Sequence, residues 1–240
     1  MTAAFATAPE RAPAETRALL RIYDALSREH PWQEWHWRED TPPLVQCLSA
    51  ILVQHTNWKN VDRALEQLER AGALSLEAIL RLPEEELASL VRAAGTPLTK
   101  ARRLKAFASL VDREAGGDLA RLLALSAGEL RAKLLATPGI GEETADAIAL
   151  YSAGKPVFVI DAYTRRLFRR LGFGPAGERY GVWQRWFEER LAPAAEGAAA
   201  VALYRRYHAY IVLHSKRVCR ARPLCGRCVL RAMCPAARDE

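Results

Sequence analysis

Hydrophobic residues recur at helical spacing along most of the chain. In the segment 44–52 they stand at i, i+4, i+7 and i+8, which places them on one face of a helix. Three further stripes follow at similar spacing. The apolar positions are Leu44, Leu48, Ile51 and Leu52; then Val61, Leu65 and Leu68; then Leu87, Leu90 and Val91; then Leu104, Phe107 and Leu110. The pattern predicts a series of packed, amphipathic helices.

Signals for helix ends agree with this interpretation. Pro83 stands where a helix would start, Gly95 stands where one would end, and Ser126 with Glu129 has the spacing of a capping box. The β-branched run at 157–160 is isolated, because no second strand candidate is available to pair with it. We expect this run to be a buried extended connector, and we predict an all-α fold.

Composition and charge narrow the class of protein. The chain has 240 residues, half of them hydrophobic, which is enough for one large core or two small ones. Lys and Arg outnumber Asp and Glu by 35 to 28, giving a formal charge of +7 and a pI near 9.4, which favours a polyanionic partner. No apolar run approaches the roughly 20 residues of a membrane span. Residues 1–17 do not resemble a signal peptide, so we predict a disordered tail there and a cytoplasmic protein, nucleoid-associated if bacterial.

Four of the five cysteines lie close together near the end of the sequence. They are Cys219, Cys225, Cys228 and Cys234. In a reducing cytosol, such clustering indicates a metal site rather than disulfides. Four thiolates suit either tetrahedral zinc or a 4Fe-4S cluster, and one tight pair flanked by two wider arms suits a single compact cluster loop better. Cys47 lies in an apolar stretch and is predicted to be a buried structural thiol.

The segment 134–145 places a helix end, a tight glycine turn and a new helix start in succession. The turn is Pro138, Gly139, Ile140 and Gly141. Its glycines allow the backbone to approach a ligand closely, and its N–H groups can hold a phosphate without any contact to a base. The turn is also a candidate site for a monovalent cation. An ordinary connection between two helices is the alternative interpretation.

The run Thr137–Arg170, together with residues 54–57 and the cysteine quartet, resembles the helix-hairpin-helix DNA glycosylases of the endonuclease III superfamily. The resemblance implies a monomer with two helical domains, a cleft between them for double-stranded DNA containing a damaged base, and a 4Fe-4S cluster. The first cysteine interval is one residue shorter than in the commonest pattern of this family. The implied parts are a discontinuous domain of residues 18–40 and 156–218, a six-helix domain of residues 41–155 that carries the hairpin, and a cluster loop of residues 219–234.

The same resemblance assigns Asp161 as the catalytic carboxylate. Breaking an N-glycosidic bond builds positive charge on the sugar, and a carboxylate can either stabilise that charge or activate the attacking water. Asp161 is also expected to be the N-cap of a helix over Ala162–Leu171. Glu143 occupies the place of the family's nucleophilic lysine, and a carboxylate cannot form a Schiff base. We therefore predict a monofunctional glycosylase. Asp62 and Asp146 are expected to be solvated.

The stretch 31–37 holds three tryptophans and one histidine, and it is a candidate lining for an extruded base. It resembles the 3-methyladenine glycosylase branch of the superfamily, which implies that His36, Trp37 and Lys216 border the base. The alternative is that the tryptophans pack a seam between domains.

Two further groups are expected to contact DNA. By the resemblance, Gln54 fills the gap that the extruded nucleotide leaves, although residues 54–57 can equally form a helix C-cap. Non-specific phosphate contacts are expected from the arginines at positions 165, 166, 169, 170, 217, 220 and 222, Arg165 and Arg220 in particular.

The sequence thus predicts a base excision glycosylase that hydrolyses the bond to a flipped damaged base, with alkylated purines as one candidate substrate class. Three alternatives remain open. One is a bifunctional glycosylase with weak AP lyase activity. Another is a non-catalytic module that binds damaged DNA, since loss of the hairpin lysine is also what a degraded enzyme would show. The third is a zinc-bound helical scaffold.

Overall fold

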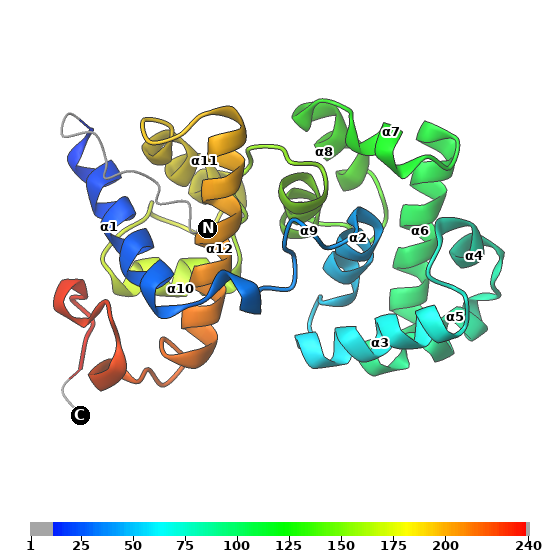
Figure 1. Ribbon diagram of the computed structural model, residues 1–240, viewed down its shortest axis with the longest axis horizontal. Helices are drawn as coiled ribbons and strands as arrows, with labels where there is room; N and C mark the ends of the chain where they lie inside the picture. The colour runs from blue at the N-terminus through cyan, green and yellow to red at the C-terminus, as the bar shows by residue number, and fades with distance from the viewer. Residues whose placement is uncertain (1–11, 239–240) are drawn as a thin grey trace. The chain divides into compact units, whose positions relative to one another are not determined.

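The computed structural model describes residues 12–238, which contain helices and no β-strand. The predicted all-α fold is confirmed. The chain divides into two compact units (Figure 1). One comprises Met1–Arg38 and Gly154–Glu240 and is called the discontinuous unit; the other comprises Glu39–Ala153 and is called the continuous unit. Within residues 12–238, no helix combines the length and the apolar character that a membrane span requires.

The continuous unit contains more helices than the six expected. Short segments such as α4 and α7, of 6 and 5 residues, also form helices, and the hydrophobic stripes alone do not reveal them. The helices are α2 (Pro43–Leu52), α3 (Trp58–Arg70), α4 (Leu76–Arg81), α5 (Glu84–Leu90), the 3-10 turn η2 (Arg92–Ala94), α6 (Pro97–Ala115), α7 (Leu119–Leu123), α8 (Ala127–Leu135), α9 (Glu142–Ala147) and the π-helical η3 (Ile148–Ser152).

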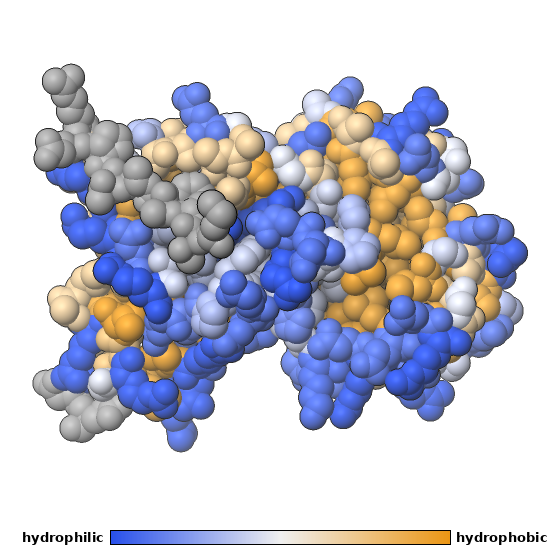
Figure 2. Space-filling model, viewed as in Figure 1, coloured by the Kyte–Doolittle hydropathy of each residue, from blue (hydrophilic) through white to orange (hydrophobic). Residues whose placement is uncertain are grey.

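The apolar stripes become the packed faces of these helices. In α3, Val61, Ala64 and Leu68 are buried, and the opposite face of the helix is charged. Figure 2 shows this division, with hydrophilic residues over α3 and hydrophobic residues gathered between α3 and α7. The predicted capping box is present, since Ser126 and Glu129 each bond the other's backbone N–H at the start of α8.

The discontinuous unit is built around its longest helix, α12, which packs against α1 and α10 (Figure 1). The Tyr207 hydroxyl of α12 donates to the Leu19 carbonyl of α1 at 2.7 Å. Helix α1 begins at Ala14, so residues 14–17 are helical rather than part of a disordered tail; residues 1–11 lie outside the described residues. The elements are α1 (Ala14–Glu29), η1 (Trp32–Glu34), α10 (Ala162–Arg170), α11 (Tyr180–Leu191), α12 (Gly197–Arg217), η4 (Cys225–Arg227) and η5 (Arg231–Met233).

The run 157–160 is an extended, largely buried connector, as predicted. Phe158 stacks on Phe187 with ring centroids 4.3 Å apart, and its N–H donates to the Glu188 carboxylate at 2.8 Å. The Ile160 N–H donates to the Tyr180 hydroxyl at 3.2 Å. Side chains of α11 therefore replace the partner strand, and they fix the backbone that leads into Asp161.

Candidate functional site

Asp161 lies at the start of α10 and is only 7% exposed. Its backbone is extended, and its Oδ1 accepts a hydrogen bond from the Thr164 N–H at 2.7 Å, which confirms the predicted N-cap. Helix α10 ends at Arg170, one residue before the predicted end. Because one oxygen is used by the cap, the other oxygen is the one available for chemistry.

That second oxygen faces His208 of α12. The His208 Nε2 lies 3.6 Å from Asp161 Oδ2, and both side chains are buried. Burial by itself raises the pKa of Asp161, but the interactions with His208 and Thr164 act the other way, and the pKa is held below its usual range. The buried carboxylate is therefore ionised at neutral pH. Sequence reasoning missed His208, because a single histidine in an apolar helix gives no signal of its own.

The aromatic stretch 31–37 reaches Asp161 through His208. The Trp35 ring meets the His208 ring edge to face with centroids 5.8 Å apart, and Trp37 meets Trp35 at the same distance. Trp37 is buried and His36 is exposed.

Lys216 is the third residue of the predicted base pocket. It is exposed near the end of α12, and its Nζ lies 6.0 Å from the centroid of the Tyr163 ring. Partial burial lowers the pKa of Lys216, and the negative charge of Asp161 acts in the opposite direction. The structure thus brings Lys216 into the electrostatic range of Asp161.

The hairpin joins α8 to α9 in the continuous unit. Gly139 has φ +84°, a conformation that L side chains rarely adopt, and Ile140 is buried and anchors the turn. The Ile140 N–H donates to the Thr137 carbonyl at 3.1 Å. Glu143 is exposed in the first turn of α9. The predicted order of helix, glycine turn and helix is therefore present.

Gln54 is bound to the hairpin by its side chain. Its amide nitrogen donates to the Gly139 carbonyl at 3.2 Å and to the Thr144 hydroxyl at 3.0 Å, and its Oε1 accepts from the Arg103 guanidinium. In this structure the Gln54 side chain fixes the turn that carries Gly139. Its predicted contact with the orphaned base stays a prediction.

Lys100 is a buried cation that the sequence did not single out. Its ammonium donates to the carbonyls of Ile51, Leu52 and Gln54, at 3.3, 2.7 and 2.6 Å. Lys100 therefore caps the C-terminal end of α2, the role considered for residues 54–57. Asn57 instead caps α3, where its side chain accepts from the Asn60 N–H. Burial lowers the pKa of Lys100 to about 8.

Asp146 is not solvated, contrary to expectation. It is fully buried in α9 and pairs with Arg131 of α8, whose Nε lies 2.8 Å from Asp146 Oδ1. Arg131 also approaches Glu142 at 3.4 Å. These ion pairs join the two helices on either side of the hairpin. The contact depends on how α8 and α9 fold back on each other, which the sequence pattern does not show.

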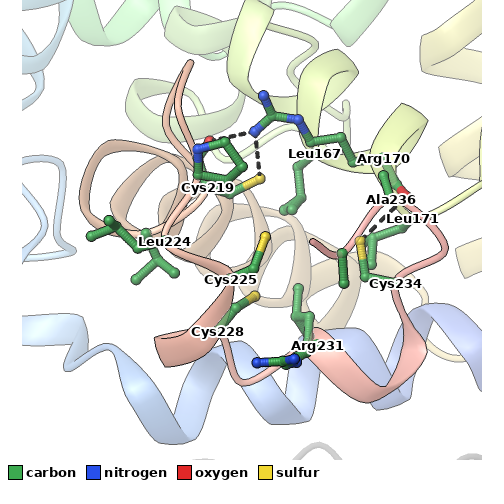
Figure 3. A pocket seen from close by; sticks show the side chains of 14 residues that line it. Leu167, Arg170, Leu171, Cys219, Leu224, Cys225, Cys228, Arg231, Cys234 and Ala236 are labelled. Atoms are coloured by element: carbon green, nitrogen blue, oxygen red, sulfur yellow. Dashed lines mark hydrogen bonds between the residues drawn. The ribbon is translucent and has the colours of Figure 1, made fainter. Parts of the chain in front are cut away.

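The four terminal cysteines line one pocket of the discontinuous unit (Figure 3). Cys219 and Cys225 are buried, while Cys228 and Cys234 are partly exposed. Burial raises the pKa of the Cys228 thiol to about 11, and the charges of Cys219 and Cys234 act in the same direction. Cys47 is fully buried elsewhere, as predicted, and burial raises its pKa to about 12.

Two arginines of α10 hold the cysteine segment. Arg170 donates to the Cys219 sulfur at 3.2 Å and to the carbonyls of Arg220 and Ala221, and Arg166 donates to the carbonyls of Ser215 and Cys219. Backbone carbonyls take up part of the donor capacity of both guanidinium groups, and their expected phosphate contacts stay a prediction.

The remaining basic residues lie nearer the surface. Arg220 is exposed, and Arg165 is half-buried with its guanidinium carbon 6.0 Å from the Tyr180 ring centroid. Arg165 also lines a polar hollow formed by Ala162, Arg165, Arg166, Arg169, Arg170 and Glu178. Arg169 pairs with Glu178 in this hollow. Arg165 and Arg220 stay candidates for contact with a polyanion.

This combination of a glycine hairpin, a buried ionised aspartate and an all-helical fold defines a helical DNA-repair protein. Residues 48–193 match the HhH-GPD superfamily of base excision DNA repair proteins, and the chain belongs to this superfamily. The predicted DNA N-glycosylase activity is thereby confirmed.

One relative and two solved structures are similar to most of this chain. MJ1434 of Methanocaldococcus jannaschii, which is named as a DNA repair glycosylase, is 36% identical over 90% of this chain and 95% of its own. The H. pylori 3-methyladenine DNA glycosylase bound to 1,N6-ethenoadenine has a TM-score of 0.70 and 27% identity over 85% of this chain and 97% of its own. The structure of a trapped endonuclease III–DNA intermediate has a TM-score of 0.74 and 18% identity, covering 92% of this chain and 96% of its own. At this identity the similarity is one of fold.

Proposed function

We propose that this protein is a monofunctional glycosylase that removes alkylated purines from double-stranded DNA. The observation that carries the proposal is the buried, ionised carboxylate of Asp161, with one oxygen fixed by Thr164 and the other facing His208. An ionised carboxylate held away from bulk water interacts strongly with a cation that forms beside it.

Asp161 serves the reaction in two ways. As the bond between sugar and base lengthens, positive charge builds on the sugar, and the Asp161 carboxylate stabilises that charge. A water molecule then attacks the sugar carbon, and Asp161 accepts its proton. The base leaves with the electron pair of the broken bond. A purine alkylated at ring nitrogen N3 or N7 already carries a positive charge, so it becomes neutral on leaving and needs no acid from the protein.

The substrate class follows from the aromatic side chains near Asp161. Trp35 and Trp37 belong to the same unit as Asp161, and electron-rich rings attract a cationic base. The solved H. pylori relative is a 3-methyladenine glycosylase with an ethenoadenine bound, which agrees with a modified purine as the substrate. His36, Trp37 and Lys216 are proposed to border the base.

The hairpin is proposed to bind the DNA backbone. Its turn from Pro138 to Gly141 presents N–H groups to a phosphate, and a monovalent cation at the turn would add a positive charge there. Gln54 stiffens the turn, while Arg165 and Arg220 supply further phosphate contacts. Action on DNA implies that the protein works with the chromosome, in the cytoplasm if the cell is bacterial, and we propose that it does so as a monomer.

We propose that the cysteine quartet holds a 4Fe-4S cluster. The proposal is supported by the four cysteines, which line a single pocket. Four thiolates are the usual ligand set of such a cluster. A bound cluster supplies a cross-link among the four sulfur atoms and a centre able to exchange one electron. Arg166 and Arg170 hold the ligand segment against α10.

Replacing Cys225 by Ser is expected to remove the cluster. Iron should fall from about four atoms per chain to nearly none, and the brown absorption should be lost, because three remaining thiolates hold the cluster poorly. The matched control is Cys47→Ser, which changes a buried thiol in the other unit and should leave iron unchanged. Zinc in place of iron in the native protein would contradict the cluster and favour a zinc site.

The proposed reaction is tested with duplexes that carry an alkylated purine, an oxidised pyrimidine, uracil or a mismatch. We expect release of the alkylated purine with the strand left uncut until alkali is added, because Glu143 cannot attack the sugar as an amine. Borohydride should trap no covalent complex, whereas Glu143→Lys should restore some trapping. Efficient trapping by the native protein would instead indicate an amine such as Lys216, and the variant Lys216→Gln would test that. Binding of damaged duplex without base release would favour a non-catalytic module.

A further inference from the structure

Three side chains of types that can ligate a metal ion meet inside the discontinuous unit. They are Glu29 and His30 at the end of α1 and His214 near the end of α12. The imidazoles of His30 and His214 are 2% and 0% exposed, and the Glu29 side chain is 20% exposed. His30 Nε2 lies 3.3 Å from His214 Nδ1, and Glu29 Oε2 lies 3.0 Å from the former and 2.7 Å from the latter.

These separations suit a small divalent ion. Zinc binds imidazole nitrogen and carboxylate oxygen at about 2.0–2.2 Å, so two ligand atoms of a tetrahedral site stand roughly 3.3 Å apart. The spacing of the two nitrogen atoms already has this value, and the two spacings to Glu29, at 3.0 and 2.7 Å, need to lengthen by about 0.3 and 0.6 Å. Two histidines and one glutamate also form a ligand set that zinc uses together with one water molecule.

Cys228 of the quartet lies next to this group. His214 Nε2 lies 3.5 Å from Cys228 Sγ, while His214 Nδ1 lies 2.7 Å from Glu29 Oε2. The two ring nitrogens of His214 therefore face different partners, so Nδ1 is placed to bind a metal ion while Nε2 keeps a second contact.

We propose that Glu29, His30 and His214 bind one zinc ion beside the cysteine quartet, an inference that rests on the proposed occupancy of the quartet by a metal. His30 Nε2, His214 Nδ1 and Glu29 Oε2 are the protein ligands, and water completes the site. His214 Nε2–H donates to the Cys228 thiolate, as metal-bound histidines commonly donate their second N–H to an acceptor. The zinc ion would tie the end of α1 to the end of α12, where the cysteine segment begins.

Metal analysis of the purified, iron-loaded protein tests this proposal. We expect one zinc per chain in addition to the iron, and we expect X-ray absorption at the zinc edge to show nitrogen and oxygen at about 2.0–2.1 Å with no sulfur near 2.3 Å. His30→Gln should lose the zinc and retain the iron. His55→Gln, which changes an exposed histidine of the continuous unit, is the matched control and should retain both.

Glu29→Gln provides a second variant if His30→Gln does not fold, because Glu29 is the most exposed of the three ligands and an amide of the same shape replaces it. It should bind zinc at least tenfold more weakly. Absence of zinc from iron-loaded native protein dialysed against zinc would overturn the proposal and leave the three side chains as a hydrogen-bonded cluster. A sulfur shell around zinc would overturn it too, since the zinc would then occupy the quartet. Iron content, read in the same sample, reports separately on the quartet.

Discussion

Replacing Asp161 by Asn is expected to slow base release by roughly 10²–10³-fold, the usual loss when one stabilising group of a transition state is removed. Asparagine has the same shape, but it carries no negative charge beside the sugar and cannot take a proton from water. It does remain a good N-cap, so α10 should keep its bond to the Thr164 N–H. The defect should therefore appear mainly in catalysis, and the fold of α10 should be kept.

Single-turnover base release and urea unfolding, measured on the same preparations, separate these two effects. Asp161→Asn should lower the rate, keep the cap and lose only the stability that the ionised carboxylate contributes at neutral pH. Asp161→Ala should lower the rate equally and cost about 1 kcal/mol more stability than Asp161→Asn, because the cap is lost as well. A native rate of base release in Asp161→Asn would refute the assigned role of the carboxylate.

The lowered pKa of Asp161 sets the expected pH dependence. The group has a pKa near 3.9 in an unfolded chain, and its pKa in the folded protein is lower. Its contribution to stability is therefore present above about pH 4 and is lost as the pH falls through the folded value. Between pH 5 and 8 Asp161 stays ionised, so any change of rate in that window must come from another group.

The sequence predicted those features that depend on residues close together in the chain. The stripe at 44–52 became α2, Ser126 and Glu129 formed their capping box, and Asp161 capped α10. Each of these depends on residues within about two helical turns, so the spacing of residue types is enough to reveal it. The glycine turn of the hairpin was visible for the same reason.

Contacts between distant segments could not be predicted in this way. His208 faces Asp161 from a helix that starts 36 residues after it (197 − 161), and Lys100 reaches back to carbonyls 46 to 49 residues earlier. Arg166 and Arg170 were predicted only as phosphate ligands of an arginine-rich segment, and their bonds to the cysteine segment were not foreseen. The identity of a single residue does not reveal which distant residue it contacts.

Replacing Gly139 by Ala is expected to lower the free energy of unfolding of the continuous unit by about 1–3 kcal/mol. Gly139 has φ +84°, and a Cβ added there would lie 2.4 Å from the Arg103 Cγ. Arg103 must then move, and it would release Gln54, which holds the Gly139 carbonyl. The turn should lose both its backbone conformation and its support, so duplex binding should weaken together with stability.

Gly141→Ala is the matched control for Gly139→Ala, because it makes the same change at the other glycine of the turn. Gly141 has φ −92° and no heavy atom within 4 Å of an added Cβ, so unfolding should change by less than about 0.5 kcal/mol. Duplex binding should nevertheless weaken, because the new methyl group would occupy space that a bound phosphate needs. Urea unfolding and fluorescence anisotropy with an abasic duplex measure the two quantities. If Gly141→Ala bound the duplex as tightly as the native protein, the phosphate would not lie against this turn, and the hairpin would be only a connection between α8 and α9.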